Sequence, residues 1–481
     1  MTPIGFSAKH RFPRVFLVLA ALCAANALVL VFASLETRVV LARVQLFAVL
    51  GHALLGTFLV AWVLKDTRFE RVPLTAVVAL AILVRFISVW ASPLLEDDHY
   101  RYLWDGFRTA VAFNPYGLAP NEFFANDTLD DRWQNILSGI NHPELPTIYG
   151  PVLQYFFALA YFIQPGKLGA IQGLLLSIDL VVIALLIFER LPIRWLLVYA
   201  IHPAITKEIM ASAHPDILVG LFLLAACLAW KRQRRFLTGT LLGLAIATKA
   251  PAVLGCVLLL WKSSALPTSP VYPLNVVTAV ETRSRIFWRA LIPDWHWALP
   301  NFLAMALVLI FAYLPFWWAS GSDIASLLIF GERWKFNPLL FRVIELALGP
   351  ELARPAALFL FTVVCFGLTW SWRKKSPAYP PIELLFTALL LLAPVVNPWY
   401  WTWGLALAVL KRSQWVIFLS CAGCLSYLNH TVLSEAGMIA SRDLAASFGV
   451  PWLVTIAQLA LALVLLIIFR KSSPRKNLIG A

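Results

Sequence analysis

Four acidic residues crowd into the stretch "EDDHYRYLWD", where Glu96, Asp97, Asp98 and Asp105 fall within a chain that is 60% hydrophobic. One carboxylate at the start of a helix is readily explained as an N-cap that the helix dipole favours. Three consecutive carboxylates beside an apolar segment are costly unless they have a function. Such acids could act as a general base on a hydroxyl group, bind a metal ion or handle a cation.

The composition indicates the medium in which these acids lie. Only 13% of the 481 residues are charged and the mean hydropathy is +0.78, whereas a soluble domain has roughly 25% charged residues. Apolar runs recur at about 20 residues, the length that crosses about 30 Å of hydrocarbon. We therefore expect an all-α polytopic membrane protein with about 12 to 14 transmembrane helices, some of them broken.

The net charge of +14 follows a pattern along the chain. Basic residues cluster between apolar runs, in groups that begin at Lys9, Lys65, Arg190, Lys231, Lys262, Arg373, Lys411 and Arg470. The positive-inside rule places such clusters in the cytoplasm, so nucleic-acid binding is not needed to explain the charge. The remaining polar segments then face outward, which predicts a multi-pass protein of the inner (plasma) membrane with its active site on the outer, periplasmic face.

The acids open a predicted outer loop at residues 93–148, which is long enough to be functional. A helix is expected from about Asp97 to Phe113, because no proline interrupts this segment and Asn114-Pro115 ends it. The expected polar stripe is Asp97, Arg101, Asp105 and Arg108, and the expected apolar stripe is Tyr100, Leu103, Trp104 and Phe107. This pattern predicts an amphipathic helix on the membrane surface. The helix-like segment at Tyr149–Ile163 is expected to be short and re-entrant or interfacial.

Several motifs occur in a recognisable order: "DDHYRYLWDG", "NPY", "TIYGP", "HPD" and "NPWYW". In these motifs the chain resembles the integral-membrane GT-C glycosyltransferases, most of all bacterial polyprenyl-phosphate-mannose-dependent mannosyltransferases of family 87. The resemblance implies a GT-C-like catalytic domain over residues 73–470, with 93–148 as its outer catalytic loop. Residues 1–72 are expected to add N-terminal transmembrane spans, and residues 471–481 to form a basic cytoplasmic tail.

The resemblance implies an inverting transfer of a sugar, mannose by default, from a polyprenyl-phosphate donor to a hydroxyl group of a glycan, lipid or glycolipid. It also implies an acidic general base at the start of the first outer loop, which corresponds to Asp97 or Asp98. Neighbouring residues of a helix point about 100° apart, so both cannot face one acceptor. We prefer Asp98.

The departing lipid phosphate requires cationic residues on the outer face. Lys249 lies between two apolar segments, and Arg333 and Lys335 lie among aromatic residues in "GERWKFNPLLF"; interfacial snorkelling explains the latter two equally well. The other substrate-binding candidates are Glu96, Arg101, Asp105, His142, Tyr149, His214, Asp216, Trp399 and Tyr400. Purely structural explanations are also open for some of these residues. Asp216 could be a helix N-cap, His142 a loop residue without a role, and Trp399 and Tyr400 part of an aromatic belt at the membrane interface.

Metal dependence stays open at this point. Residues 96–98 could supply oxygen ligands to a divalent cation, but no cluster of histidine and cysteine indicates zinc. No nucleotide-binding fingerprint is present, so a nucleotide-sugar donor is not expected. The rival functions are a transporter or flippase of lipid-linked or envelope precursors and a non-catalytic scaffold. The position of the acids in a loop, and not at the membrane midplane, argues against transport.

Overall fold

The computed structural model describes residues 14–35, 41–262, 294–375, 379–436, 438 and 449–470. Within these residues the regular secondary structure is helical, apart from one isolated β-bridge between Phe336 and Val395. The prediction of an all-α protein is confirmed. The basic tail at 471–481 and the basic residues between Lys262 and Asp294 lie outside the described residues.

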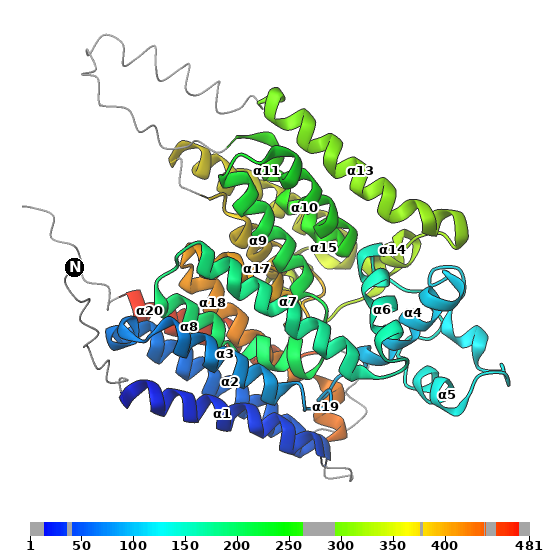
Figure 1. Cartoon of the computed structure of the whole chain (residues 1–481), viewed down its shortest axis with the longest axis horizontal. Helices are drawn as coiled ribbons and strands as arrows, with labels where there is room; N and C mark the ends of the chain where they lie inside the picture. Colours follow the sequence, from blue (N-terminus) through cyan, green and yellow to red (C-terminus); the bar gives the residue numbers. More distant parts are fainter. Residues whose placement is uncertain are drawn as a thin grey trace, which may run out of the picture.

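Long apolar helices form the frame of the molecule (Figure 1). Five described helices are long and apolar enough to cross a membrane: α1 (Arg14–Leu35), α2 (Leu41–Lys65), α7 (Leu168–Phe188), α13 (Trp295–Ala319) and α15 (Leu339–Lys375). Eight shorter apolar helices accompany them. α15 is kinked at Gly349, whose φ of 79° is left-handed and which precedes Pro350. Broken and short spans are what the sequence predicted for a polytopic protein.

The other helices connect and extend this frame. They are η1 (Thr67–Arg71), α3 (Leu74–Ser88), α4 (Asp98–Ala112), η2 (Pro120–Phe123), α5 (Asp131–Ser138), α6 (Pro151–Ile163), α8 (Ile193–Ala200), η3 (Ile205–Ala211), α9 (Ile217–Lys231), α10 (Arg235–Thr248), η4 (Ala250–Cys256), α11 (Val257–Leu260), α14 (Ile324–Arg333), α16 (Ile382–Leu392), η5 (Pro398–Trp401), α17 (Thr402–Lys411), α18 (Gln414–Ala422), η6 (Gly423–Tyr427), α19 (His430–Glu435) and α20 (Trp452–Arg470).

The helices run between two chemically different ends. α9 begins next to Asp216 and ends at Lys231, and its neighbour α10 returns from Arg235 to Lys249, which pairs with Asp216. At the end of the bundle where Lys231 and Arg235 lie, ion pairs join the basic segments between helices to acidic residues. The pairs are Arg194 with Glu70, Lys231 and Arg232 with Glu189, and Lys411 with Glu383. The described basic clusters that begin at Lys65, Arg190, Lys231 and Lys411 therefore share one end of the bundle, and the acidic loop lies at the other.

A buried ion pair ties the central helices together. Arg85 of α3 contacts the carboxylate of Asp179 on α7 and donates to the carbonyl oxygen of Ala200 at 2.6 Å. Both charged side chains are fully buried. The sequence predicted that Arg85 has an internal partner and a structural role, and these contacts agree with it.

The helix predicted at 97–113 is confirmed as α4. It ends where Phe113 adopts a left-handed φ of 50°, just before Asn114-Pro115. α4 packs closely on α6, since a Cβ atom on Gly106 would lie 2.5 Å from the carbonyl oxygen of Phe157. Only a glycine allows this approach between the two helices, which lie side by side at the edge of the molecule (Figure 1).

Two residues of the polar stripe of α4 are covered by other parts of the loop, while Asp97 is exposed. Arg101 and Asp105 are buried. The Arg101 guanidinium donates to the carbonyl oxygens of Leu145 and His142, each at 3.0 Å, and the Asp105 carboxylate accepts from Gln154 at 3.2 Å. The chain after α5 folds back over the polar stripe, so these side chains hold the loop together.

α6 does not have the length of a span. Its 13 residues extend about 20 Å, less than the hydrocarbon thickness of about 30 Å. Its first end follows Tyr149 and its second end lies near α5, where Arg132 donates to the carbonyl oxygen of Pro165 at 3.2 Å. Both ends of α6 thus lie beside the 93–148 loop, in agreement with the predicted re-entrant or interfacial segment.

Candidate active site

A cavity of about 700 Å³ opens at the end of the bundle opposite the basic clusters. Its walls come from the segment before α4, residues 141–149, the end of α10, and residues 334–336, 395–400 and 427–435. Ten predicted site residues line it: Glu96, Asp97, Asp98, Arg101, His142, Tyr149, Lys249, Lys335, Trp399 and Tyr400. Segments that are far apart in sequence therefore build one site, as the motif order suggested.

Asp98 occupies the first turn of α4 and faces the cavity. Its carboxylate lies 3.4 Å from the hydroxyl of Tyr102 and 3.5 Å from that of Tyr149, and both hydroxyls can donate to it. Burial, and secondly the negative charge of Asp97, raise the pKa of Asp98 to about 6, while Lys249 acts in the opposite direction. A carboxylate with this pKa is ionised at neutral pH and is a stronger base than an ordinary aspartate.

Asp97 has different surroundings. It stands at the N-cap position of α4, but its side chain makes no capping hydrogen bond. Instead the carboxylate accepts from the amide of Asn141 at 2.6 Å, and burial raises its pKa. Asn141 thus bonds Asp97 closely and also stabilises the ionised form of Asp98, whereas the two tyrosine hydroxyls contact only Asp98.

Lys249 brings a positive charge to the cavity wall. Its ammonium group donates to Asp216 at 2.8 Å and lies 5.2 Å from the ring centroid of Tyr400 and 5.6 Å from that of Tyr149. Asp216 also accepts from the indole of Trp403 at 2.5 Å and forms no side-chain cap on α9. The N-cap role for Asp216 is therefore wrong, because its buried carboxylate instead orients Lys249.

Aromatic rings form a rigid wall beside these charges. The ring of His214 stacks on Trp399 with centroids 3.7 Å apart and planes 13° apart. The Nδ1 atom of His214 lies 2.8 Å from the hydroxyl of Tyr102 and 3.9 Å from the carboxylate of Asp98. His214 is fully buried behind the wall, so it supports Trp399 and Tyr102 without lining the cavity.

The remaining predicted residues divide between the cavity and other places. His142 is half exposed and its ring packs edge-on against Trp334. Lys335 lines the cavity and pairs with Glu345. Arg333 is exposed at the end of α14 and is not part of the lining, because the chain turns between it and Lys335. Together with the buried Asp105, His214 and Asp216, it is one of four predicted residues that do not line the cavity.

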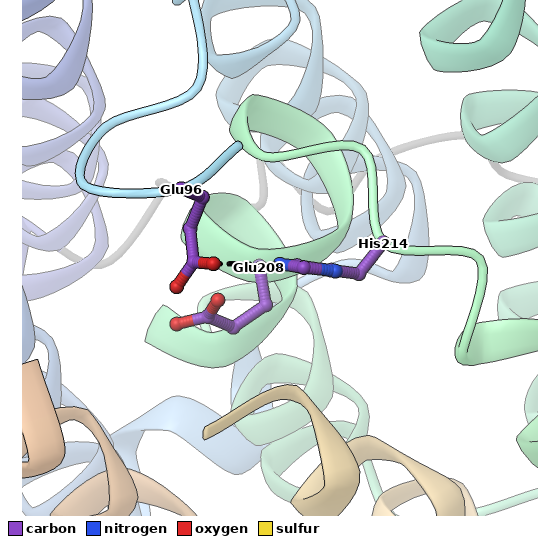
Figure 2. Close-up of side chains that lie close together, drawn as sticks. All are labelled: Glu96, Glu208 and His214. Atoms are coloured by element: carbon purple, nitrogen blue, oxygen red, sulfur yellow. Dashed lines mark ion pairs between the residues drawn. The ribbon is translucent and has the colours of Figure 1, made fainter. Parts of the chain in front are cut away.

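Sequence reasoning missed Glu208 and Tyr427, which belong to a buried polar cluster below the cavity. Lys207 and Glu208 lie on η3, a π-helical turn, and both are fully buried. The hydroxyl of Tyr427 contacts Lys207 and donates to Glu208 at 2.9 Å. Glu208, Glu96 and His214 bring possible metal-ligand atoms to within 4.8 Å of one another (Figure 2). The available signal was a charged pair inside the apolar stretch "IHPAITKEIMASAHPD".

Comparison with protein families assigns the chain. Residues 15–265 match the family described as alpha-(1->6)-mannopyranosyltransferase, N-terminal domain (the MptA/B family). This match covers more than half of the 481 residues. The chain belongs to this mannosyltransferase family. Among curated proteins and solved structures, comparison finds no match.

Membership in the MptA/B family makes the protein a membrane-embedded glycosyltransferase and confirms the resemblance to GT-C mannosyltransferases. It decides against the transporter and scaffold alternatives. The matched region contains nearly all of α1, all of α2, and Asp98, His214 and Lys249, while later residues such as Trp399 complete the cavity.

Proposed function

We propose that this mannosyltransferase moves mannose from a polyprenyl-phosphate-linked donor to a hydroxyl group of a glycan, lipid or glycolipid, with inversion, at the outer face of the inner (plasma) membrane. The observation that best supports the proposal is a single cavity in which the Asp98 carboxylate and the Lys249 ammonium group lie among aromatic rings. A base for the acceptor and a cation for the departing phosphate are the two charges that the reaction requires.

In the proposed step the acceptor oxygen attacks the anomeric carbon while Asp98 takes the hydroxyl proton. The new bond joins the acceptor oxygen to the anomeric carbon. The bond between that carbon and the phosphate oxygen breaks, and its electron pair leaves with the lipid phosphate. Lys249 stabilises the phosphate charge, and Trp399 and Tyr400 offer ring faces for the sugar. No further reactant is needed.

The proposal prefers Asp98 over Asp97 because of what each carboxylate contacts. The strong hydrogen bond from Asn141 at 2.6 Å occupies Asp97. The contacts of Asp98 with Tyr102 and Tyr149 are longer, at 3.4 and 3.5 Å, so its lone pairs are less committed. A general base must be free to receive a proton from its substrate.

The proposed outer location rests on the two ends of the bundle. The described basic clusters that begin at Lys65, Arg190, Lys231 and Lys411 gather at the end opposite the cavity, and the positive-inside rule assigns that end to the cytoplasm. α9 and α10, with 15 and 14 residues, extend only about 21 to 23 Å. Lys249 and Asp216 at their ends therefore lie below the membrane surface, at a depth that a lipid-linked phosphate can reach.

The proposal is tested by offering different donors to the purified full chain in lipid nanodiscs. An α-linked product formed by inversion requires a β-linked donor, so we expect transfer from polyprenyl-phosphate-β-mannose and none from its α anomer. Guanosine diphosphate mannose is the control for a nucleotide-sugar donor. Transfer from that nucleotide donor, or a product with the anomeric configuration of the donor, would contradict the proposal.

A further inference from the structure

The cluster beneath the cavity contains polar atoms whose bonding the protein itself does not complete. Oε1 of Glu208 and Nε2 of His214 are both buried, and neither has a hydrogen-bond partner in the part of the chain that the structure describes. The carboxylate of Glu96 lies 3.9 Å from Nε2, too far for a hydrogen bond. Buried polar atoms without partners are expensive, so a ligand between them would remove a cost.

The three groups converge from different segments. Figure 2 shows the carboxylate of Glu208, from η3, beside that of Glu96, from the segment before α4, and a dashed line that joins Glu96 to the His214 ring. Their nearest ligand atoms all lie within 4.8 Å of one another. A divalent cation with ligand bonds of about 2.1 to 2.5 Å fits between atoms at such separations.

The charge balance also leaves room for a cation. Lys207 contacts Glu208 at 3.4 Å through Oε2, which leaves Oε1 facing the cluster. The Lys207 ammonium group faces the two carboxylates of Glu96 and Glu208. Asp98 adds a third negative charge 3.9 Å from His214, and Lys249, which also acts on Asp98, is already paired with Asp216. Lys207 alone therefore does not neutralise the site, and a buried net charge is unfavourable.

The surroundings of His214 are those of a metal-ligating histidine. Nδ1 lies 2.8 Å from the hydroxyl of Tyr102, and the hydroxyl of Tyr102 can in turn donate to Asp98 at 3.4 Å. With its proton on Nδ1, the ring donates to Tyr102 and directs the Nε2 lone pair at the two glutamates. Stacking on Trp399 fixes the ring plane. Ligating histidines are commonly oriented in this way by a hydrogen bond from the second nitrogen.

We propose that Glu96, Glu208 and His214 bind a divalent cation that accepts both carboxylate and imidazole ligands, namely Mn²⁺ or Zn²⁺. The cation would link the segment that carries Asp98 to η3. Glu96 lines the cavity and Glu208 does not, so the ion would be part of the cavity wall. This site does not depend on the proposed donor or reaction, since binding of the ion can be measured without turnover.

The experiment uses the purified full chain in nanodiscs after treatment with a chelator and desalting. Binding of Mn²⁺ alone is followed by loss of the free-ion electron paramagnetic resonance signal, and bound Zn²⁺ is measured by elemental analysis. We expect a single ion per chain, and a rise in the unfolding temperature when it binds. Glu96→Gln and Glu208→Gln should each weaken binding at least about tenfold.

Glu435→Gln is the matched control, because Glu435 lines the same cavity but lies outside the cluster. It should bind the ion like the unmodified protein. Glu96 is partly exposed, so its variant remains informative if Glu208→Gln does not fold. Absence of binding by the unmodified chain at millimolar Mn²⁺ and Zn²⁺, or unchanged binding by both glutamine variants, would overturn the proposal. In that case a proton shared between the two carboxylates would complete the cluster.

Discussion

Gly106 sets the distance between the helix that carries Asp98 and the helix that supports it. A Cβ atom at this position would lie 2.5 Å from the carbonyl oxygen of Phe157 and 2.9 Å from its carbonyl carbon. Ordinary contact begins at 3.4 Å, and contacts under 3.0 Å are essentially never seen. Gly106→Ala must therefore separate α4 from α6 by about 0.5 to 0.9 Å.

This displacement should affect catalysis more than folding. A misplacement of about 1 Å can lower a rate by about a hundredfold, so we expect kcat to fall by about 10- to 100-fold. Overpacking costs about 1 to 3 kcal/mol, part of which the higher helix propensity of alanine offsets. The assays are mannosyl transfer in nanodiscs and thermal unfolding of the same sample. Asp98 lies about two turns from Gly106, within the same rigid helix.

Gly173→Ala on α7 is the matched control, because a Cβ atom there would meet nothing within 4 Å. It should keep the wild-type kcat and should unfold at the same or a higher temperature. If Gly106→Ala turned over at the wild-type rate while folded, the contact between α4 and α6 would not position Asp98 for turnover, and the reasoning would be refuted.

Two further predictions concern buried charges. Burial raises the pKa of Asp105 from 3.8 to about 6, so the folded protein holds this proton more tightly than the unfolded chain does. The resulting contribution to the free energy of unfolding is fully present below about pH 4 and is lost as the pH rises through 6. Asp105→Asn should therefore stabilise the fold by up to about 3 kcal/mol at pH 7.5, with no gain at pH 4 and with turnover retained; unfolding temperatures that are lower at both pH values would contradict this. Lys249→Met should lower kcat/KM for the donor by about 10²- to 10³-fold and also destabilise the protein, because it leaves Asp216 as an unpaired buried charge. The double variant with Asp216→Asn should recover the unfolding temperature but not turnover, and recovery of both would exclude a phosphate-binding role.

Local signals in the sequence were sufficient to place α4. Acids at its start, the absence of proline and the Asn114-Pro115 stop define its ends, and all three act within the segment itself. The sequence did not, however, show which face of α4 is covered by the rest of the chain. The stripe of polar residues does not reveal which of them are covered, because Arg101 and Asp105 are bonded by residues more than 40 positions later in the chain.

The motif residues and the cluster below them also show that contacts between distant parts of the chain are hard to predict from sequence. Ten candidates share one cavity because they lie at the same ends of successive helices, which the charge pattern already indicated. Glu208 was missed because its neighbours come from distant parts of the chain, Glu96 from the segment before α4 and Tyr427 from η6, and no spacing rule connects them. Arg333 and Lys335 are two residues apart, yet only the turn after α14 determines which one reaches the cavity.

The central claim is that Asp98 removes the acceptor proton in the mannosyl transfer. It is tested most directly by the rate of a single turnover with saturating lipid-linked donor, compared among the unmodified chain, Asp98→Asn and Asp97→Asn. Loss of a general base typically lowers a rate by about 10² to 10⁴-fold, so we expect this loss for Asp98→Asn, with donor affinity retained. Asp97→Asn should remain within about tenfold of the unmodified rate, because asparagine can still accept the hydrogen bond from Asn141. A fully active Asp98→Asn variant, or a loss confined to Asp97→Asn, would contradict the account.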